Sequence, residues 1–266
     1  MAVTLTFGDV AENHVGMQKH GVKASSGLSV ETLERACGIF RERHPGIVCE
    51  TFDLVALSGI LHEYSLEPAS IIVVRGGVNA LLATVGGNAN SLLSEQTPLE
   101  TDKKAFMRGQ VKNKLARHNL CFSDVGIQPK YESGQGRVIA YSEVPQLDQI
   151  RRLLPDYFGH QAEKLQVEGN YYYDTSKCGI GFHGDSERRI VVAVRLGASI
   201  PLHYQWFYHS SPIGARIVIH PPLRHGDIYA MSDAAVGWRW RRSSIPTLRH
   251  AAGSPKFLEI KIRDEE

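Results

Sequence analysis

The second half of the chain alternates short apolar runs with turn residues. One such run, RIVVAVRL over residues 189–196, is rich in β-branched side chains and stops at Gly197. β-Branched side chains fit a pleated sheet better than a helix, so this run predicts a strand. Several short strands separated by Gly, Pro and Ser are typical of an antiparallel barrel or jelly roll. The expected strands cover residues 189–196, 202–208, 215–220, 228–231 and 256–263.

The first part of the chain has a mixed pattern. Leu33, Ala36 and Phe40 recur at helical spacing after Ser29, which predicts an amphipathic helix over residues 29–44. Similar patterns predict a helix over residues 53–64, a buried strand over residues 71–75 that ends in a glycine turn, and a basic helix over residues 101–118.

These elements together predict an α+β protein in two parts. With 266 residues and 42% apolar content, the chain is long enough to bury a substantial core. We expect residues 121–266 to form a jelly-roll core. We expect residues 1–120 to form an N-terminal α/β extension that packs on this core.

Composition bears on the partners and the cellular compartment of the protein. The 30 basic residues nearly balance the 28 acidic ones, so any contact with nucleic acid must be local. The four cysteines, at positions 37, 49, 121 and 178, form no CxxC pair, which favours a reducing compartment. No signal-peptide pattern opens the chain, and no segment approaches 18 uninterrupted apolar residues. We therefore expect an intracellular protein, cytoplasmic or nuclear, with no membrane association.

The stretch NYYYDTSKCGIGFHGD, residues 170–185, ends in His183-Gly184-Asp185. Side chains one residue apart on a strand project to the same side, so His183 and Asp185 can hold one metal ion together. Two imidazoles and one carboxylate, with other coordination positions open, form the ligand set of non-haem Fe(II) oxygenases. A surface loop is the alternative interpretation of the pattern taken alone.

Three downstream histidines compete for the third ligand position. His250 lies 65 residues after Asp185, a separation that leaves room for several intervening strands. His225 lies in the sequence LRHGD, which is typical of a turn, and His220 lies shortly before it. We therefore expect His250 to complete the metal site.

Three motifs in this order resemble those of the AlkB-like Fe(II)- and 2-oxoglutarate-dependent dioxygenases. Residues 170–172 are similar to the family's Asn-x-Tyr, and residues 179–187, GIGFHGDSE, to its Ile-Gly-x-His-x-Asp-x-Glu. Residues 223–228, LRHGDI, are similar to its Leu-x-x-Gly-Asp strand. The resemblance covers about 100 of the 266 residues. It implies that the core is a double-stranded β-helix (jelly-roll) with catalytic function, flanked by N-terminal helices and strands.

The resemblance also implies roles for single residues. It assigns His183, Asp185 and His250 to Fe(II), and it assigns Asn170 and Tyr172 to hydrogen bonds with the cosubstrate 2-oxoglutarate. With O2, 2-oxoglutarate is converted to succinate and CO2 while a substrate C–H group is hydroxylated. An N-hydroxymethyl product loses formaldehyde, which is demethylation, whereas a carbon-bound one is a stable alcohol. The ligand set is the same for both outcomes and does not choose between them.

The C-terminus departs from the family pattern Arg-x-Asn-x-Thr-x-Arg. If Arg263 occupies the place of the second arginine, Phe257 occupies that of the first and cannot bind a carboxylate. We expect Arg263 to anchor the cosubstrate, with Lys261 as the second candidate, because a guanidinium grips a carboxylate with two hydrogen bonds and an ammonium acts as a point charge. The alternative is that both residues cap a terminal strand in solvent.

Aromatic and basic residues suggest a substrate. Trp238, Arg239 and Arg241 lie close in sequence to His250, and such residues stack on bases and pair with phosphates. Tyr204 and Trp206 share one face of an expected strand and are candidates for stacking a flipped base. For both groups, packing in the protein core or at a strand edge is the competing interpretation.

The sequence thus predicts an oxidoreductase that uses Fe(II), 2-oxoglutarate and O2, with Glu187 at its substrate pocket. DNA or RNA is the expected partner, through N-demethylation or methyl hydroxylation. Two alternatives stay open: a protein or small-molecule hydroxylase on the same fold, and a non-catalytic binding module with a vestigial site.

Overall fold

The first strand of the chain lies in the middle of the main sheet. In the computed structural model, which describes residues 1–260, β1 (Ala2–Gly8) pairs antiparallel with β10 (Gln166–Tyr172) on one side and β12 (Val191–Gly197) on the other. Apolar and threonine side chains alternate along β1, so the apolar ones pack into one core while Thr4 and Thr6 face the other way. The chain terminus therefore forms part of the centre of the fold.

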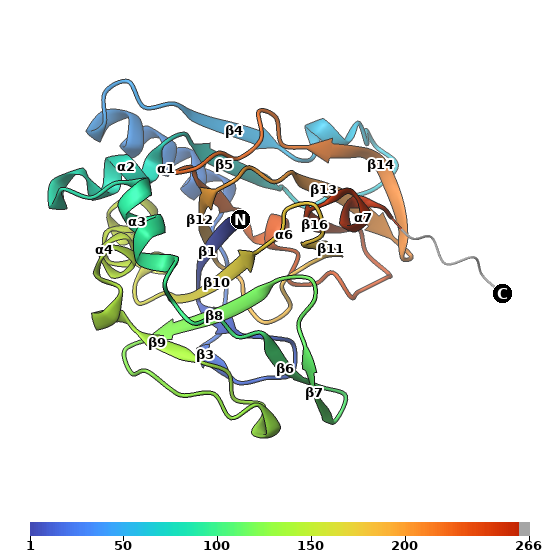
Figure 1. Ribbon diagram of the computed structural model, residues 1–266. Helices are drawn as coiled ribbons and strands as arrows, with labels where there is room; N and C mark the ends of the chain where they lie inside the picture. The colour runs from blue at the N-terminus through green and yellow to red at the C-terminus, as the bar shows by residue number, and fades with distance from the viewer. Residues whose placement is uncertain (261–266) are drawn as a thin grey trace.

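The main sheet has eight strands in the order β4-β5-β15-β12-β1-β10-β8-β9 (Figure 1). Neighbouring strands are antiparallel except β8 and β9, which are parallel. Strands from before and after residue 120 both belong to this sheet, so the N-terminal part supplies strands to it as well as packing on it. The further strands are β4 (Cys49–Asp53), β5 (Ser70–Val74), β8 (His118–Ser123), β9 (Val138–Ala140) and β15 (Ile228–Met231).

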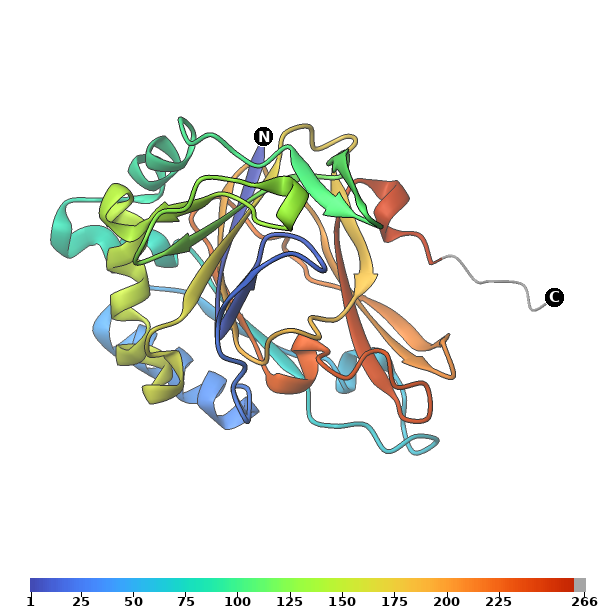
Figure 2. The ribbon, with the colours of Figure 1, turned by 90° about the horizontal axis from the view of Figure 1, so that it is seen from below.

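A second sheet of four strands, in the order β11-β16-β13-β14, faces the main sheet. Figure 2 shows the two sheets on either side of the molecule, with β1 in blue in one and β16 in red in the other. One apolar core draws side chains from both sheets, among them Val191 and Tyr229 from the main sheet and Tyr204 and Trp206 from the small one. The strands of the small sheet are β11 (Gly179–His183), β13 (Leu202–Tyr208), β14 (Ser211–Val218) and β16 (Thr247–Gly253).

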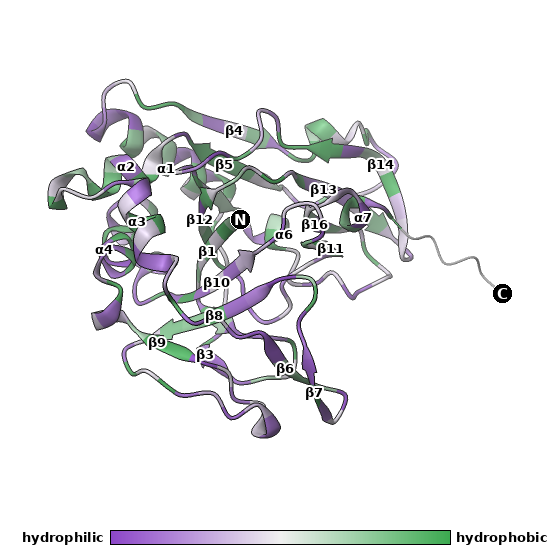
Figure 3. Ribbon diagram, in the orientation of Figure 1, coloured by the Kyte–Doolittle hydropathy of each residue, from purple (hydrophilic) through white to green (hydrophobic). Residues whose placement is uncertain are grey.

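Helices α1 to α5, whose bounds follow, cover the other face of the main sheet (Figure 1). The first, α1 (Val30–Arg43), begins after Ser29, whose side chain accepts a hydrogen bond from the Thr32 N–H, so the expected helix and its cap are confirmed. Figure 3 shows that the central strands are largely hydrophobic. The other helices are α2 (Gly77–Leu82), α3 (Ala89–Gln96), α4 (Pro145–Leu153), α5 (Pro155–Phe158), α6 (Asp233–Val236) and α7 (Pro255–Leu258), with 3-10 turns η1 (Ala56–Ser58), η2 (Ala83–Val85), η3 (Tyr131–Ser133), η4 (Tyr141–Glu143) and η5 (His160–Ala162).

The fold is therefore mixed α+β and rich in antiparallel strands, as expected. The predicted strands at residues 71–75, 189–196, 202–208 and 228–231 are confirmed as β5, β12, β13 and β15. The strand expected over 215–220 is the second half of β14. Two short hairpins complete the structure: β2 (Val10–Glu12) with β3 (Lys19–Gly21), and β6 (Lys104–Met107) with β7 (Gln110–Asn113).

Two predicted helices are wrong. Only the single turn η1 forms within residues 53–64, because Gly59 directly after it adopts a left-handed conformation (φ 67°) that ends the turn. Residues 101–118 form the β6–β7 hairpin, which turns at Arg108 and Gly109, both with positive φ. The even distribution of basic residues in this stretch resembled a helix surface, but the turn residues decide its structure.

The predicted C-terminal strand is also wrong in its first part. Pro255 follows Ser254 and begins the short helix α7, because proline is favoured in the first turn of a helix and cannot donate to a sheet ladder. Lys261 and Arg263, expected on the same strand, lie outside the described residues.

The cysteines differ from expectation. Cys37 of α1 and Cys49 of β4 form a disulfide with a Cα–Cα distance of 5.6 Å. No sequence motif marks this pair, since the helix and the strand approach each other only in the folded chain. Cys121 and Cys178 are buried free thiols. Among the described residues, no helix combines the length and the apolar character needed to cross a membrane.

The central position of β1 gives a test of the fold. Phe7 is fully buried in the core beneath the helices, so Phe7→Ala should lower the free energy of unfolding by roughly 3–5 kcal/mol in chemical denaturation. Val125→Ala is the control because Val125 is 71% exposed, and its expected effect is within roughly 0.5 kcal/mol. Equal effects of the two substitutions would contradict the placement of β1.

Candidate metal centre

Two neighbouring strands bring the three predicted ligands together. His183 is the last residue of β11, and His250 lies within β16. The two histidines are direct cross-strand partners in the antiparallel pair. Asp185 follows two residues after His183, where the chain leaves the strand. The site therefore combines one local pair with one residue from a distant segment.

The three side chains converge on one point. One potential ligand atom from each of His183, Asp185 and His250 lies within 4.8 Å of the others. Asp185 Oδ1 lies 3.4 Å from His183 Nε2 and 3.9 Å from His250 Nε2. The predicted triad is thus a group that can hold a metal ion.

Gly184 makes the close approach of this loop possible. A Cβ atom at position 184 would lie 2.1 Å from the carbonyl oxygen of Gly237, so any other residue would push the loop away from the end of α6. The next residue, Asp185, donates its N–H to the Val236 carbonyl at 3.0 Å. Gly184, between the two ligands, is therefore needed for the close packing of this loop against the end of α6.

The backbone fixes the orientation of the His183 ring. Its Nδ1 lies 2.8 Å from the Gly181 carbonyl and 3.1 Å from the His250 carbonyl. Carbonyls accept hydrogen bonds, so Nδ1 carries the proton and the lone pair of Nε2 points toward Asp185. Such a bond on the far side of the ring is what orients a metal-ligating histidine.

Burial and charge set the protonation states. Burial, reinforced by the neighbouring His183, lowers the pKa of His250 to about 4, so its imidazole is neutral at pH 7. Burial opposes ionisation of Asp185, but Arg188 and the two histidines outweigh it and hold the pKa of that carboxyl below its usual range. His250 and Asp185 are therefore in the forms that bind a cation.

The triad opens into a cavity of about 750 Å³ between the two sheets. This volume lies in the range of small-molecule sites. The cavity is lined by strands of the main sheet, by β11 and β16, and by the segment after β2. Of the residues predicted to bind cosubstrate or substrate, the cavity brings together Asn170, Tyr172, Glu187 and Arg241.

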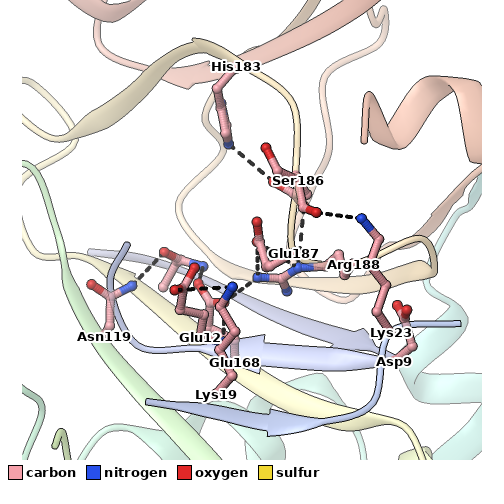
Figure 4. A network of polar contacts seen from close by, with 12 residues as sticks. Asp9, Glu12, Lys19, Lys23, Asn119, Glu168, His183, Ser186, Glu187 and Arg188 are labelled. Carbon is pink, nitrogen blue, oxygen red and sulfur yellow. Dashed lines mark hydrogen bonds and ion pairs between the residues drawn. The ribbon is translucent and has the colours of Figure 1, made fainter. Parts of the chain in front are cut away.

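A buried arginine organises the carboxylates of the cavity (Figure 4). Arg188 donates to Glu168 at 2.5 Å and to Glu187 at 2.9 Å, and its Nε lies 3.6 Å from Asp185. Burial lowers the pKa of Arg188, but the carboxylates outweigh it and raise that pKa above its usual value. Glu187 is thereby held by Arg188, at the wall of the cavity.

Asn170 is held by the same polar wall. Its Oδ1 accepts hydrogen bonds from Arg117 (2.5 Å) and Asn119 (2.8 Å), and its Nδ2 donates to Glu168 at 3.0 Å. An amide nitrogen has two hydrogens, so one N–H of Asn170 stays available for a ligand.

Tyr204 and Trp206 do not line this cavity, contrary to expectation. Both are buried in the core between the sheets, with Tyr204 beside His250 and the Trp206 indole donating to the Leu54 carbonyl at 3.0 Å. The side chains of β13 that face the main sheet pack into the core between the two sheets. The competing core interpretation is therefore correct for this pair.

Trp238 and Arg239 also lie outside the cavity. The Trp238 ring lies beneath the Arg189 guanidinium, 4.2 Å away, and Arg239 pairs with Glu67. Trp240, the second tryptophan of the stretch 237–242, lines the cavity instead and donates from its indole N–H to Ser186 Oγ at 2.9 Å. The direction of side chains through a turn is not fixed by local sequence, so only the folded chain decides which of the two tryptophans faces the cavity.

Sequence reasoning also missed Arg188, Glu168 and Arg195, all of which line the cavity. Arg195 offers a sequence signal, because it is a charge within the apolar run RIVVAVRL. A charge in a strand that is buried on both faces needs a polar partner or a ligand.

The chain matches no protein-family model. It is 45% identical over 260 residues to uncharacterized protein R156 of Acanthamoeba polyphaga mimivirus, and the match covers 97% of each chain. The chain belongs to the same family as this viral protein.

Metal binding tests the triad directly. Each of His183→Ala, Asp185→Ala and His250→Ala should weaken Mn(II) binding by more than about 100-fold in calorimetric titration, since loss of an indirect contact already costs 10- to 100-fold. The control variants are His62→Ala and Asp124→Ala, which alter exposed residues of the same types. Unchanged affinity in any triad variant would remove that residue from the site.

The low pKa of His250 predicts a pH dependence of stability. The unfolded chain takes up a proton on this imidazole near pH 6.5 and the folded chain only near pH 4. Between these values the unfolded state binds more protons, so metal-free protein loses up to about 3 kcal/mol of unfolding free energy through His250 as the pH falls. In urea titrations, His250→Gln should reduce the change of unfolding free energy with pH, and the exposed-residue control His62→Gln should not. The same pH dependence in His250→Gln and the wild type would contradict the low pKa of His250.

Proposed function

We propose that this protein is an Fe(II)- and 2-oxoglutarate-dependent oxygenase of the AlkB-like type. The observation that carries the proposal is the convergence of His183, Asp185 and His250 at the wall of a cavity large enough for two small molecules. Two imidazoles and one carboxylate match the ligand set of non-haem Fe(II) oxygenases.

The donor set of the cavity fits the metal and the cosubstrate. All three triad side chains come from one side, the β11–β16 edge, and leave the cavity side open for further ligands. No thiol reaches the triad among residues 1–260, and nitrogen and oxygen donors without sulfur suit Fe(II). Two sheets packed face to face around the site support a double-stranded β-helix as the finer description of the fold.

In this proposal the protein residues bind and orient. The triad would hold Fe(II), and the free N–H of Asn170 and the Tyr172 side chain would contact 2-oxoglutarate. When bound, Fe(II) and 2-oxoglutarate would supply, with O2, the oxidising chemistry that hydroxylates a substrate C–H group and yields succinate and CO2. Burial raises the pKa of Tyr229 to about 12, so its hydroxyl stays a neutral hydrogen-bond donor in the cavity.

Apolar side chains keep water from the reacting groups. Val191, Leu202 and Met231 are buried and line the cavity. A drier site strengthens every electrostatic contact inside it and suppresses side reactions. Arg188 offsets part of the negative charge of the carboxylates beside the triad.

The rim of the cavity supports DNA or RNA as the substrate. Trp240 lines the cavity, and the guanidinium groups of Arg241 and Arg249 lie 5.3 and 5.2 Å from its ring centre. A tryptophan flanked by arginines can stack on a base and meet phosphates at the same time. Lys19 adds an exposed positive charge at the same cavity.

Turnover tests the proposed function. Protein with Fe(II), 2-oxoglutarate and O2 should form succinate, and methylated DNA or RNA oligonucleotides should lose 14 mass units per demethylation or gain 16 per hydroxylation, the masses of CH2 and O. His183→Ala should abolish both signals, and His62→Ala should retain them. Methylated peptides form the third substrate arm, and modification of peptides alone would replace nucleic acid by protein as the substrate. Absence of metal-dependent succinate formation with every substrate would refute the proposal.

A further inference from the structure

A buried arginine that has no partner among the described residues lines the cavity. Arg195, in β12, is 1% exposed. Its Nε and Nη1 atoms have no hydrogen-bond partner among residues 1–260. Burying a guanidinium without a partner costs free energy. Such a group therefore indicates a place where an anion binds.

The other cations of the cavity are engaged or exposed. Arg188 is surrounded by carboxylates, of which Glu168 lies at 2.5 Å. Arg117 is half-buried and donates to an amide oxygen, while Lys19 and Arg241 are exposed to solvent. Arg195 is therefore the cation of this cavity that is neither paired with a carboxylate among residues 1–260 nor exposed to solvent.

A polar row runs across the sheet from Arg195. In the antiparallel register, Thr4 of β1 is the partner of Arg195 on one side and of Asn170 on the other. The Thr4 hydroxyl is also buried without a partner among residues 1–260, and it lines the same cavity. With strands about 4.8 Å apart, the ends of this row are separated by roughly 10 Å, the scale of a short aliphatic diacid.

We propose that Arg195, assisted by Thr4, binds a carboxylate of a small aliphatic acid in this cavity. The inference rests on the proposed function in one respect: the acid is 2-oxoglutarate and the carboxylate is the one farther from the metal. Arg195 then performs the role that the sequence resemblance assigned to Arg263 or Lys261. A guanidinium can grip this carboxylate with two charge-assisted hydrogen bonds.

Binding to metal-loaded protein that does not turn over tests the proposal. In calorimetric titration of the Mn(II)-loaded full chain, Arg195→Met should weaken 2-oxoglutarate binding by about 100-fold, since charged hydrogen bonds are among the stronger contacts. The 2-oxoglutarate affinity of Arg195→Lys should lie between those of Arg195→Met and the wild type. Arg216 is an exposed arginine on β14, and Arg216→Met should bind 2-oxoglutarate as the wild type does. Mn(II) affinity should be unchanged in all variants.

Thermal unfolding distinguishes a binding role from a structural one. Removing an unpaired buried charge should raise the unfolding temperature of ligand-free Arg195→Met, whereas a structural arginine would lower it on removal. Added 2-oxoglutarate should then stabilise the wild type and leave Arg195→Met unchanged. Should Arg195→Met fail to fold, Arg195→Lys and Thr4→Val decide the question through their affinities.

Glutarate, a five-carbon diacid without the keto group, separates this inference from the proposed function. Wild-type protein that binds 2-oxoglutarate no more tightly than glutarate, with or without Mn(II), and loses both acids in Arg195→Met would refute the oxygenase and keep the anion site. Equal 2-oxoglutarate affinity of Arg195→Met and the wild type would overturn the anion site and keep the oxygenase. Failure of the wild type to bind either acid would overturn the anion site.

Discussion

The pairing of β11 with β16 is the interaction on which the rest of the site depends. It makes His183 and His250 cross-strand partners although 66 residues separate them in the chain. Gly184 then lets the loop approach α6 closely enough to bring Asp185 onto the same point. The ligand geometry is therefore a property of sheet register, and a shift of one residue would turn one imidazole to the opposite face.

Charge compensation is the second requirement of this cavity. Several carboxylates share a space of low polarity, and each would be costly alone. Arg188 meets Glu168, Glu187 and Asp185 together and keeps the last of these ionised. Arg195 differs because its guanidinium has no such partner within residues 1–260. Arg188 thus stabilises the structure, and Arg195 is the better candidate for binding a ligand.

The strands β12, β13 and β15 were predictable because each is a local apolar run bounded by turn residues. The His-x-Asp pair was predictable for the same reason, since period-two alternation acts within a few residues. The helix expected over residues 101–118 was wrong because Arg108 and Gly109 form a turn inside it. The expected C-terminal strand was wrong because Pro255 begins α7. In both cases local turn chemistry overrode a regular pattern of charges or apolar residues.

The sequence by itself determined which residues can bind a metal and that the runs forming β5, β12, β13 and β15 are strands, because both follow from residue type and short-range spacing. Only the tertiary structure decided that β1 lies between β10 and β12, so that Thr4, Arg195 and Asn170 form one row. It also decided that Trp240 faces the cavity and Trp206 the core. The physical reason is that strand order and the direction of side chains after a turn arise from contacts between distant segments, which local sequence does not encode.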